Sequence, residues 1–343
     1  MPHRYKPLRE QTIVLTGATS GIGLATARRA AKAGARLVLV ARNEQVLREL
    51  CEQVQRLGGQ AAYVVADVGR EDQVEQVVAV AKERFGGFDT WINNAGVVIF
   101  SRLDELPVTD HQRLFETNYW GVVYGSRAAV AHMRTRADGG TLINIASINA
   151  EMPVPILGAY SASKAAVKAY SDVLRMELAD QGAPVRVAVL KPSGISTPIS
   201  AHGRSHTGER GKVMPPLYDV EVAASAVLAA AQRPIRELTV GETGRLSEMF
   251  WHLFPKLSDR VIGWALPRVQ SSGQPPLSRD NLYQAGDDGE VYLNGQRKGL
   301  RWSPYTDARI YTWRTLGLAG LLSLGACAAW CASRGMRRRP WQP

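Results

Sequence analysis

The sequence predicts an α/β fold, a doubly wound parallel sheet with helices on both faces, followed by a C-terminal helical extension. Short apolar runs typical of buried strands alternate with helical runs between residues 11 and 240. Helices between successive strands imply parallel pairing with right-handed crossovers. Polar and glycine-rich residues follow several strands, and ligands of such sheets bind beyond those strand ends. We therefore expect a ligand site at that edge.

The elements follow from local patterns, taken in order. Residues 11–16 read as a buried strand, and the glycine-rich turn after it leads into a helix over 24–33 that Gly34 ends. Asn43 is expected to cap the helix after the next strand, and Asp219 to cap a later one. The remaining strands are expected at 36–40, 61–66, 90–93, 141–146, 185–190 and 236–240. The remaining helices are expected up to residue 58, at 71–85 and 109–134, from Tyr160 to 180, and up to residue 233.

Composition excludes some function classes. The chain has 343 residues and a formal charge of +11, but its basic residues are scattered except at the extreme C-terminus. No nucleic-acid-binding pattern accompanies them, so a phosphate-bearing cofactor or an anionic membrane surface is the more economical partner. His202 and His206 lie four apart in a loop, 196–216, that we expect to cover a pocket. No carboxylate or cysteine cluster accompanies them, and we expect no metal site.

The glycine-rich turn predicts a nucleotide site. Gly17, Gly21 and Gly23, with Ser20 and Ile22, stand between a strand and a helix. Missing side chains there let backbone N–H groups approach a pyrophosphate at the positive end of the helix. A purely structural turn is the alternative. The spacing is G-x-x-x-G-x-G rather than G-x-G-x-x-G.

Tyr160 and Lys164 form a candidate proton-transfer pair. On a helix, their spacing puts both side chains on one face about a turn apart. A tyrosine has a pKa of about 10, so a fixed positive charge is needed to favour its phenolate near neutral pH. Ser147 could hold a substrate oxygen beside them. The alternative is an ordinary lysine lying over an aromatic ring.

Together these motifs resemble the short-chain dehydrogenase/reductase family. Thr16 to Gly23, Asp67-Val68, Asn93-Asn94-Ala95-Gly96, Asn118, Ser147 and Tyr160-x-x-x-Lys164 occur in that family's order, and the resemblance covers roughly residues 10–240. It implies a Rossmann-like NAD(P)-binding catalytic domain, which we place at residues 1–245. It also implies a homo-oligomer.

The resemblance assigns roles residue by residue. Tyr160 is the implied acid/base, Lys164 its electrostatic helper and a ribose contact, Ser147 the substrate-oxygen partner, and Asn118 the holder of a water. The implied cofactor contacts are Asp67 and Val68 at the adenine, Asn94, Ala95 and Gly96 at the ribose, and Thr197 at the nicotinamide carboxamide. Asn118 and Asp67 could instead bond or cap locally. Pro192-Ser193-Gly194 replaces the Pro-Gly of many relatives, which leaves the placement of Thr197 open.

Arg42 points to NADP. An acidic residue ending the second strand would bind the ribose hydroxyls of NAD and repel a 2'-phosphate. Ala41 takes that place here, and Arg42 follows it. A guanidinium suits a phosphate, and the family pattern agrees. The alternative is that Arg42 is an ordinary solvent-facing side chain.

The last hundred residues predict a membrane anchor. Residues 246–270 form an amphipathic helical segment that could face a bulky substrate, a membrane interface or the core. Residues 271–309 are rich in turn-forming residues, as expected of a linker or loose arm. Within 310–334, residues 315–333 carry no charge, enough for a helix of ~28 Å and hence a transmembrane span. A buried dimerising helix is the alternative, and 335–343 form a basic tail.

The function expected from these features is an NADP(H)-dependent oxidoreductase that interconverts a carbonyl and a secondary alcohol on a hydrophobic substrate. We expect it to be membrane-anchored, with its catalytic domain facing the cytoplasm, where NADPH is available. The rival hypothesis is a membrane-tethered NADP-binding scaffold or redox sensor without significant catalysis. Asn118, Ser147, Tyr160 and Lys164 occurring together argues against the rival, because a scaffold needs none of them.

Overall fold

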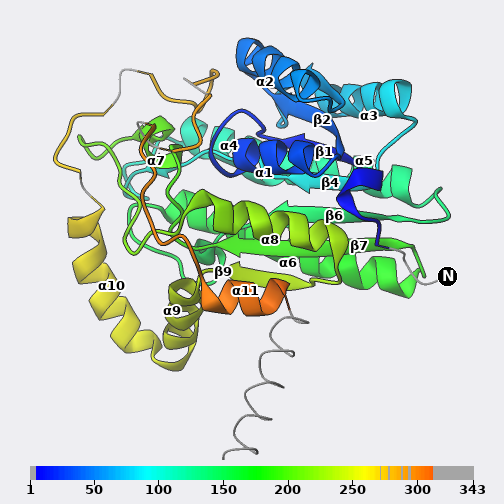
Figure 1. Ribbon diagram of the computed structural model, residues 1–343. Coiled ribbons are helices and arrows are strands. Elements are labelled where there is room, and N and C mark those ends of the chain that lie inside the picture. The colour runs from blue at the N-terminus through cyan, green and yellow to red at the C-terminus, as the bar shows by residue number, and fades with distance from the viewer. Residues whose placement is uncertain (1–4, 271, 277–278, 287–288, 293–294, 312–343) are drawn as a thin grey trace, which may run out of the picture.

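Seven parallel strands form the central sheet, in the order β3-β2-β1-β4-β6-β7-β9 (Figure 1). The computed structural model describes residues 5–270, 272–276, 279–286, 289–292 and 295–311. In chain order the strands are β1 (Thr12–Thr16), β2 (Arg36–Ala41), β3 (Ala61–Val65), β4 (Thr90–Asn93), β6 (Gly140–Ile145), β7 (Val185–Pro192) and β9 (Glu237–Val240). Val14 aligns with Val38 on one side and with Trp91 on the other. The predicted doubly wound parallel sheet is confirmed.

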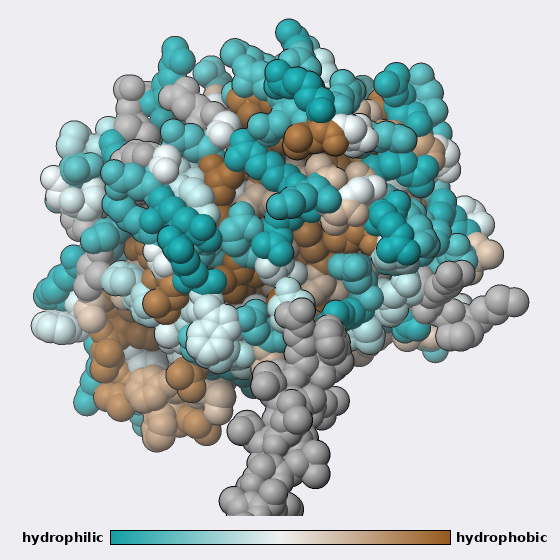
Figure 2. Space-filling model, viewed as in Figure 1, coloured by the Kyte–Doolittle hydropathy of each residue, from teal (hydrophilic) through white to brown (hydrophobic). Residues whose placement is uncertain are grey.

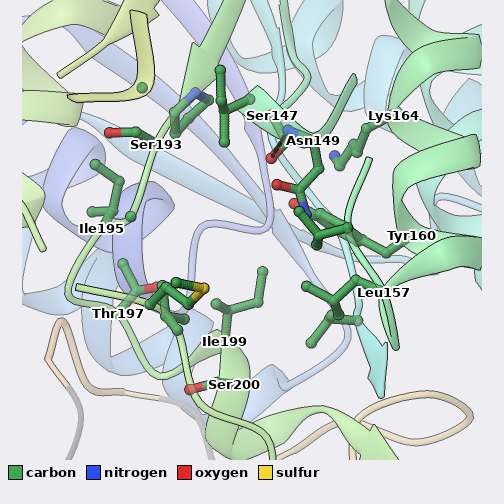
Figure 3. A pocket seen from close by; sticks show the side chains of 18 of the residues that line it. Ser147, Asn149, Leu157, Tyr160, Lys164, Ser193, Ile195, Thr197, Ile199 and Ser200 are labelled. Carbon is green, nitrogen blue, oxygen red and sulfur yellow. Dashed lines mark hydrogen bonds between the residues drawn. The ribbon is translucent and has the colours of Figure 1, made fainter. Parts of the chain in front are cut away.

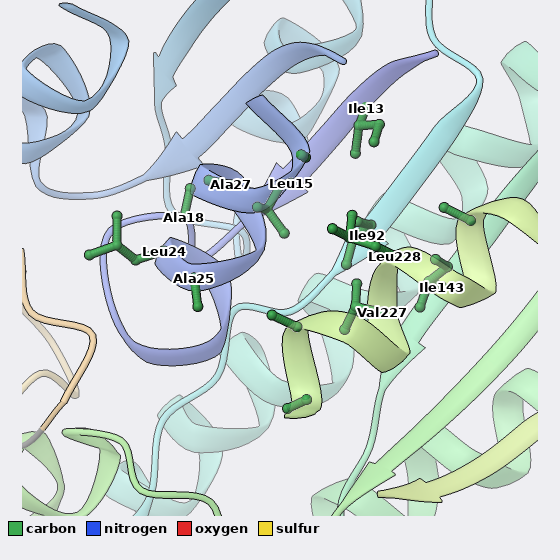
Figure 4. Packing of buried hydrophobic residues seen from close by; sticks show 14 of the residues in the cluster. Ile13, Leu15, Ala18, Leu24, Ala25, Ala27, Ile92, Ile143, Val227 and Leu228 are labelled. Atoms are coloured by element: carbon green, nitrogen blue, oxygen red, sulfur yellow. The ribbon is translucent and has the colours of Figure 1, made fainter. Parts of the chain in front are cut away.

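Helices cover both faces of this sheet. Alternate residues of β1 point to opposite faces, so Ile13 and Leu15 enter one apolar cluster and Val14 enters another. The first cluster is covered by α1 (Gly21–Lys32), α2 (Glu44–Arg56) and α8 (Val220–Gln232). Figure 4 shows Leu15 by the helix that carries Ala27, and Ile143 by the helix that carries Leu228. The second cluster is covered by α3 (Glu71–Phe85), α5 (Gly121–Met133) and α6 (Gly158–Asp180).

The helix expected over residues 109–134 is interrupted. It consists of α4 (Val108–Phe115), a π-helical turn at Glu116–Trp120, and α5. A π-turn inserts an extra residue into the helical ladder and re-aims the side chains on it, and such turns are frequent at functional sites. Asn118 lies on this turn, where it is fully buried.

Short elements lie beyond the carboxyl ends of the strands. The two-stranded sheet of β5 (Ile99–Phe100) and β8 (Arg204–Ser205) joins the loop after β4 to the loop that follows α7 (Ile199–His202). Beside it, α9 (Glu242–Leu253) and α10 (Pro255–Val269) form a helical pair. Pro255 opens α10 at its first turn, where a proline costs no hydrogen bond.

The segment expected as a linker or loose arm contacts the sheet at its strand ends. Its described residues are irregular up to α11 (Pro304–Ile310), in keeping with their turn-rich composition. Arg42 and Arg113 donate to backbone carbonyls of this segment, and Arg297 pairs with the buried Asp219. Ile310 is buried in the cluster that α8 covers. The segment therefore contacts the domain at residues 281, 282 and 297.

The predicted membrane anchoring is corrected. Within the described ranges, no helix has both the length and the apolar composition that crossing a bilayer requires. Most of the expected span, 310–334, and the basic tail fall on residues 312–343, outside the described residues. The described part of the expected span begins at the last residue of α11. This helix has seven residues and carries Asp307 and Arg309. This finding overturns the membrane-anchored localisation.

Candidate active site

A cavity of about 810 Å³ lies beyond the carboxyl ends of the strands. Residues from the glycine-rich turn, the loop after β4, the loop after β6, the N-terminal end of α6 and the α9–α10 pair line it. Figure 3 shows Ser147, Tyr160 and Lys164 gathered on one wall, with Thr197 and Ile199 across the cavity. The position beyond the strand ends is the one expected for a ligand of this fold.

The glycine-rich turn is closed by backbone approaches that no side chain would permit. A Cβ on Gly23 would lie 1.9 Å from the Gly17 carbonyl oxygen, and Gly17 itself has φ +64°. The Asn94 amide donates to the Thr16 and Gly17 carbonyls at 2.9 and 3.1 Å and so fastens the turn to the end of β4. The turn and the start of α1 therefore present backbone to the cavity, which fits the pyrophosphate and nicotinamide half of a dinucleotide.

Tyr160, Ser147 and Lys164 lie close together on the cavity wall (Figure 3). The Ser147 hydroxyl is near enough to the Tyr160 phenol to lower the pKa of that phenol, and Lys164 Nζ lies 5.8 Å from the centre of the Tyr160 ring. Ser147 occupies the N-cap of a short 3-10 helix, where its oxygen accepts from Asn149 N–H at 3.2 Å. Lys164 is buried and donates to the Ile145 carbonyl at 2.9 Å. The loop after β6 and helix α6 thus supply the whole group.

The electrostatics of the pair differ from the expectation in one respect. Burial raises the pKa of Tyr160 above its ordinary value, and the bond from Ser147 offsets this in part. Burial also lowers the pKa of Lys164 to about 8. The hydrogen bond that the amine makes goes to the Ile145 carbonyl and not to the phenol oxygen.

Asn118 lies next to this group. Its side chain exchanges hydrogen bonds with both backbone groups of Val97, accepting from N–H at 2.8 Å and donating to the carbonyl at 2.9 Å. It also donates to Ser163 at 3.1 Å. A Cβ on Gly96 would lie 3.4 Å from Asn118 Oδ1 and 3.5 Å from Lys164 Nζ. Asn118 therefore fixes the loop that separates it from the cavity.

The residues assigned to the adenosine end are placed differently. Arg42, Asp67 and Val68 do not line the cavity, although the structure describes all three. Asp67 forms an ion pair with Arg113 and accepts from Gly69 N–H at 3.0 Å. By contrast Ser20, Ile22, Ala95 and Thr197 do line the cavity, and Thr197 packs against Gly21.

Sequence reasoning missed most of the apolar wall. The lining residues that it did not single out include Met152, Val154, Leu157 and Met214. Only the amphipathic pattern of residues 246–270 indicated part of this wall, because its apolar face could contact a bulky substrate. Figure 2 shows apolar side chains gathered over α9 and α10, where Leu253, Phe254, Leu257 and Trp264 are exposed.

Comparisons with known proteins identify the family of this chain. The short chain dehydrogenase family model matches residues 11–208. The uncharacterized oxidoreductase YxnA of Bacillus subtilis is 38% identical over 97% of this chain and 93% of its own length. 3beta-hydroxysteroid dehydrogenase 1 of Eggerthella lenta is 37% identical, covering 57% of this chain and 75% of that protein.

Solved structures are similar as well. A short-chain dehydrogenase/reductase from Burkholderia phymatum in complex with NAD has a TM-score of 0.68 at 25% identity, covering 74% of this chain and 96% of that one. A short-chain dehydrogenase from Burkholderia cenocepacia in complex with NADP has a TM-score of 0.63 at 25% identity, covering 75% and 99%. With the fold, the cavity and the family match in agreement, the chain belongs to the short-chain dehydrogenase/reductase family of oxidoreductases.

Proposed function

We propose that this oxidoreductase interconverts a carbonyl and a secondary alcohol on a bulky hydrophobic substrate, with NADP(H) as cofactor and Tyr160 as the acid/base. The observation that carries the proposal is the grouping of Ser147 and Tyr160 on the cavity wall, with the buried Lys164 amine beside the ring (Figure 3). A phenol and a hydroxyl side by side can hold one substrate oxygen while a proton moves to or from it.

The residues divide the reaction between them. Ser147 donates to the substrate oxygen and fixes its position. In the direction of oxidation, Tyr160 as phenolate takes the alcohol proton; in the direction of reduction, its phenol returns that proton to the carbonyl oxygen. Lys164, charged below its pKa of about 8, favours the phenolate when its ammonium turns toward the ring. When bound, the nicotinamide ring accepts or supplies the hydride at the substrate carbon.

The apolar lining supports the substrate class. Val154, Leu157, Met214 and Leu266 face the cavity, and Phe250 lies at the α9 side of it. Burying a large hydrocarbon against such a wall contributes binding free energy in proportion to the apolar area covered. One relative of this chain is named for a hydroxysteroid, which is a substrate of this shape and polarity. A sterol-like, retinoid-like or long-chain lipid carbonyl fits best.

Arg42 supports NADP, through its position directly after Ala41 at the end of β2. The solved relatives carry NAD in one case and NADP in another, so they favour neither. In this structure Arg42 donates to the carbonyls of Asn281 and Leu282. A 2'-phosphate at the guanidinium would replace these two bonds.

Replacing Tyr160 tests the chemistry. Tyr160→Phe should bind NADPH as the unaltered chain does but lose at least about 100-fold in turnover, because general acid–base catalysis contributes about that much. The measurement is NADPH absorbance against a panel of hydrophobic ketones and alcohols. Tyr170→Phe, on the same helix but away from the cavity lining, is the matched control.

Two outcomes count against the proposal. Near-normal turnover by Tyr160→Phe would refute the assigned acid/base. If the unaltered chain binds NADPH but turns over no member of the panel, a binding protein without catalysis becomes the better description.

A further inference from the structure

A short C-terminal segment crosses the adenosine end of the dinucleotide site. We call residues 280–283 the strap. Arg42, at the end of β2, donates to the carbonyls of Asn281 and Leu282, and Arg113, on α4, donates to the Leu282 carbonyl at 3.1 Å. The strap therefore contacts both elements that border the expected adenosine position, and its backbone carbonyls accept hydrogen bonds from their guanidinium groups.

The Leu282 side chain is an anchor. It is fully buried in a cluster with Val97, Ile99, Leu114 and Ala159, residues of the loop after β4 and of α4 and α6. Full burial of a leucine in an otherwise polar surface segment is unusual, since such segments carry few apolar contacts. The cluster holds the strap in the mouth of the sheet.

The cavity ends at the strap. Its walls include Gly17, Gly21, Gly96 and Asn281, yet none of Arg42, Asp67 and Val68 lines it, although all three are described. The open space thus serves the nicotinamide half of a dinucleotide, while the adenosine half meets the strap. Asn281 Oδ1 is buried there with no hydrogen-bond partner among the described residues, which leaves this arrangement less than fully satisfied.

The groups expected to bind the cofactor are engaged elsewhere. Arg42 bonds to the strap, and Asp67 pairs with Arg113, which also bonds to the strap. The Gly21 N–H at the start of α1 donates to the Glu290 carbonyl at 3.0 Å, a second contact from the same C-terminal region. These are the donors and acceptors that an adenosine diphosphate moiety would need.

Ion pairs and hydrogen bonds connect the strap to the loop over the pocket and to α4. Asp280 pairs with Arg204 at 2.9 Å, and the Tyr283 hydroxyl donates to Asp110 at 2.9 Å. Arg204 binds the same buried Asp110 at 3.0 Å, and its guanidinium lies 5.0 Å from the centre of the Tyr283 ring. His206 also contacts Asp110, at 2.9 Å. Asp280 and Tyr283 of the strap therefore contact both the 204–206 loop and α4.

We propose that the strap is an autoinhibitory plug that competes with the dinucleotide for the adenosine end of its site. The inference rests on the proposed function, in that the cavity must take a nicotinamide dinucleotide. Binding then requires the strap to leave, so the apparent affinity is lowered by the fraction of molecules in which the strap is open. Contacts that hold the strap weaken cofactor binding, and their loss strengthens it.

Shortening the anchor tests this competition in the full chain. Leu282→Ala should bind NADPH about tenfold more tightly and associate faster, because a loosened strap raises the open fraction. Leu253→Ala, an exposed leucine of α9 outside the cavity lining, is the matched control and should bind as the unaltered chain does. Nicotinamide fluorescence on rapid mixing gives both the rate and the dissociation constant. Unchanged or weaker binding by Leu282→Ala overturns the plug.

Hydrogen exchange provides a second readout without substitution. On addition of NADPH to the unaltered chain, the amide of Asn281 should exchange faster, because its bond to the His202 carbonyl is released. Slower exchange would mean that the strap closes over the cofactor and would overturn the proposal. If neither the unaltered chain nor Leu282→Ala binds NADPH or NADH, the proposed function fails together with the plug.

Discussion

Arg42 carries two tasks at one position. Its guanidinium holds the strap in this structure and is the group that we expect to meet a 2'-phosphate. Freeing the strap helps NADPH and NADH alike, so the ratio of their efficiencies isolates the phosphate contact. A guanidinium can give a phosphate two charge-assisted bonds that a 2'-hydroxyl does not need.

Arg42→Ala should therefore lower the preference for NADPH. We expect kcat/KM for NADPH divided by that for NADH to fall about tenfold, equivalent to about 1.4 kcal/mol. The measurement is turnover with the two cofactors side by side. Arg36→Ala, at the opposite end of β2, is the control. A ratio near or below one in the unaltered chain ends the NADP inference.

Lys164 is a buried cation whose burial is unfavourable to folding. Its pKa is lowered from 10.5 to about 8, so below pH 8 both folded and unfolded chains carry the proton and the penalty is fully present. Between pH 8 and 10.5 the folded chain releases the proton first, and stability gains relative to lower pH. At neutral pH the buried charge lowers the free energy of unfolding by at most about 3 kcal/mol.

Lys164→Met should abolish turnover yet raise the free energy of unfolding at pH 7. The gain over the unaltered chain should shrink as the pH rises from 8 toward 10, because the lysine is then neutral. Urea denaturation at pH 7 and pH 10 measures it. Lys168→Met is the control from the next turn: Lys168 pairs with Asp172 at 3.1 Å and has a raised pKa, so its loss should not stabilise. Equal loss of stability in both variants would contradict the account.

At the scale of elements, Lys191 joins β7 to β9, α9 and the loop after β6. The side chain is 1% exposed and contacts Glu151, Glu237 and Glu248, whose attraction raises its pKa to about 12. Glu248 has a lowered pKa because of the same lysine. Removing the cation would leave three carboxylates clustered, one of them buried.

Lys191→Met should destabilise the fold by about 3 to 5 kcal/mol at pH 7. Glu248 gains stability from this contact above its ordinary pKa and loses it as the pH falls, so the deficit of the variant should narrow in acid. Chemical denaturation at pH 7 and pH 4 measures both values. Arg245→Met removes a 44% exposed partner of the same Glu248 and should cost under about 1 kcal/mol. A deficit that grows in acid would be inconsistent with this network.

At the scale of the whole molecule, cofactor binding and folding are linked. A ligand that binds only the folded chain at about 100 times its dissociation constant adds about 2.7 kcal/mol. For a chain of this length, that corresponds to a rise in melting temperature on the order of 5 °C. The opening of the strap subtracts from this gain, since part of the binding free energy displaces it.

NADP⁺ should therefore raise the melting temperature, and Leu282→Ala should show a larger rise than the unaltered chain at equal NADP⁺. Calorimetry or intrinsic fluorescence measures the transition. The control is pyrophosphate at equal ionic strength, because a formal charge of +11 attracts any polyanion. A shift no larger with NADP⁺ than with pyrophosphate would argue against a dinucleotide site.

The sequence by itself determined the features that depend on residues close together in the chain. Alternating apolar runs predicted the sheet, the glycine spacing predicted the turn at Gly17 to Gly23, and the four-residue spacing put Tyr160 and Lys164 on one helix face. The family resemblance singled out Asn118, but nothing in the sequence predicted the π-helical turn, Glu116–Trp120, on which it lies. A one-residue insertion changes the helical pattern of apolar residues very little.

Only the tertiary structure decided what depends on distant segments. Leu282 is 240 positions from Arg42, and no local pattern shows that its carbonyl meets that guanidinium. The same holds for the aim of the Lys164 amine at Ile145 rather than at the phenol, which the packing of α6 on β6 dictates. Long-range contacts arise from the shape of the whole core, so spacing alone predicted which groups take part in the chemistry but not which of them are already occupied.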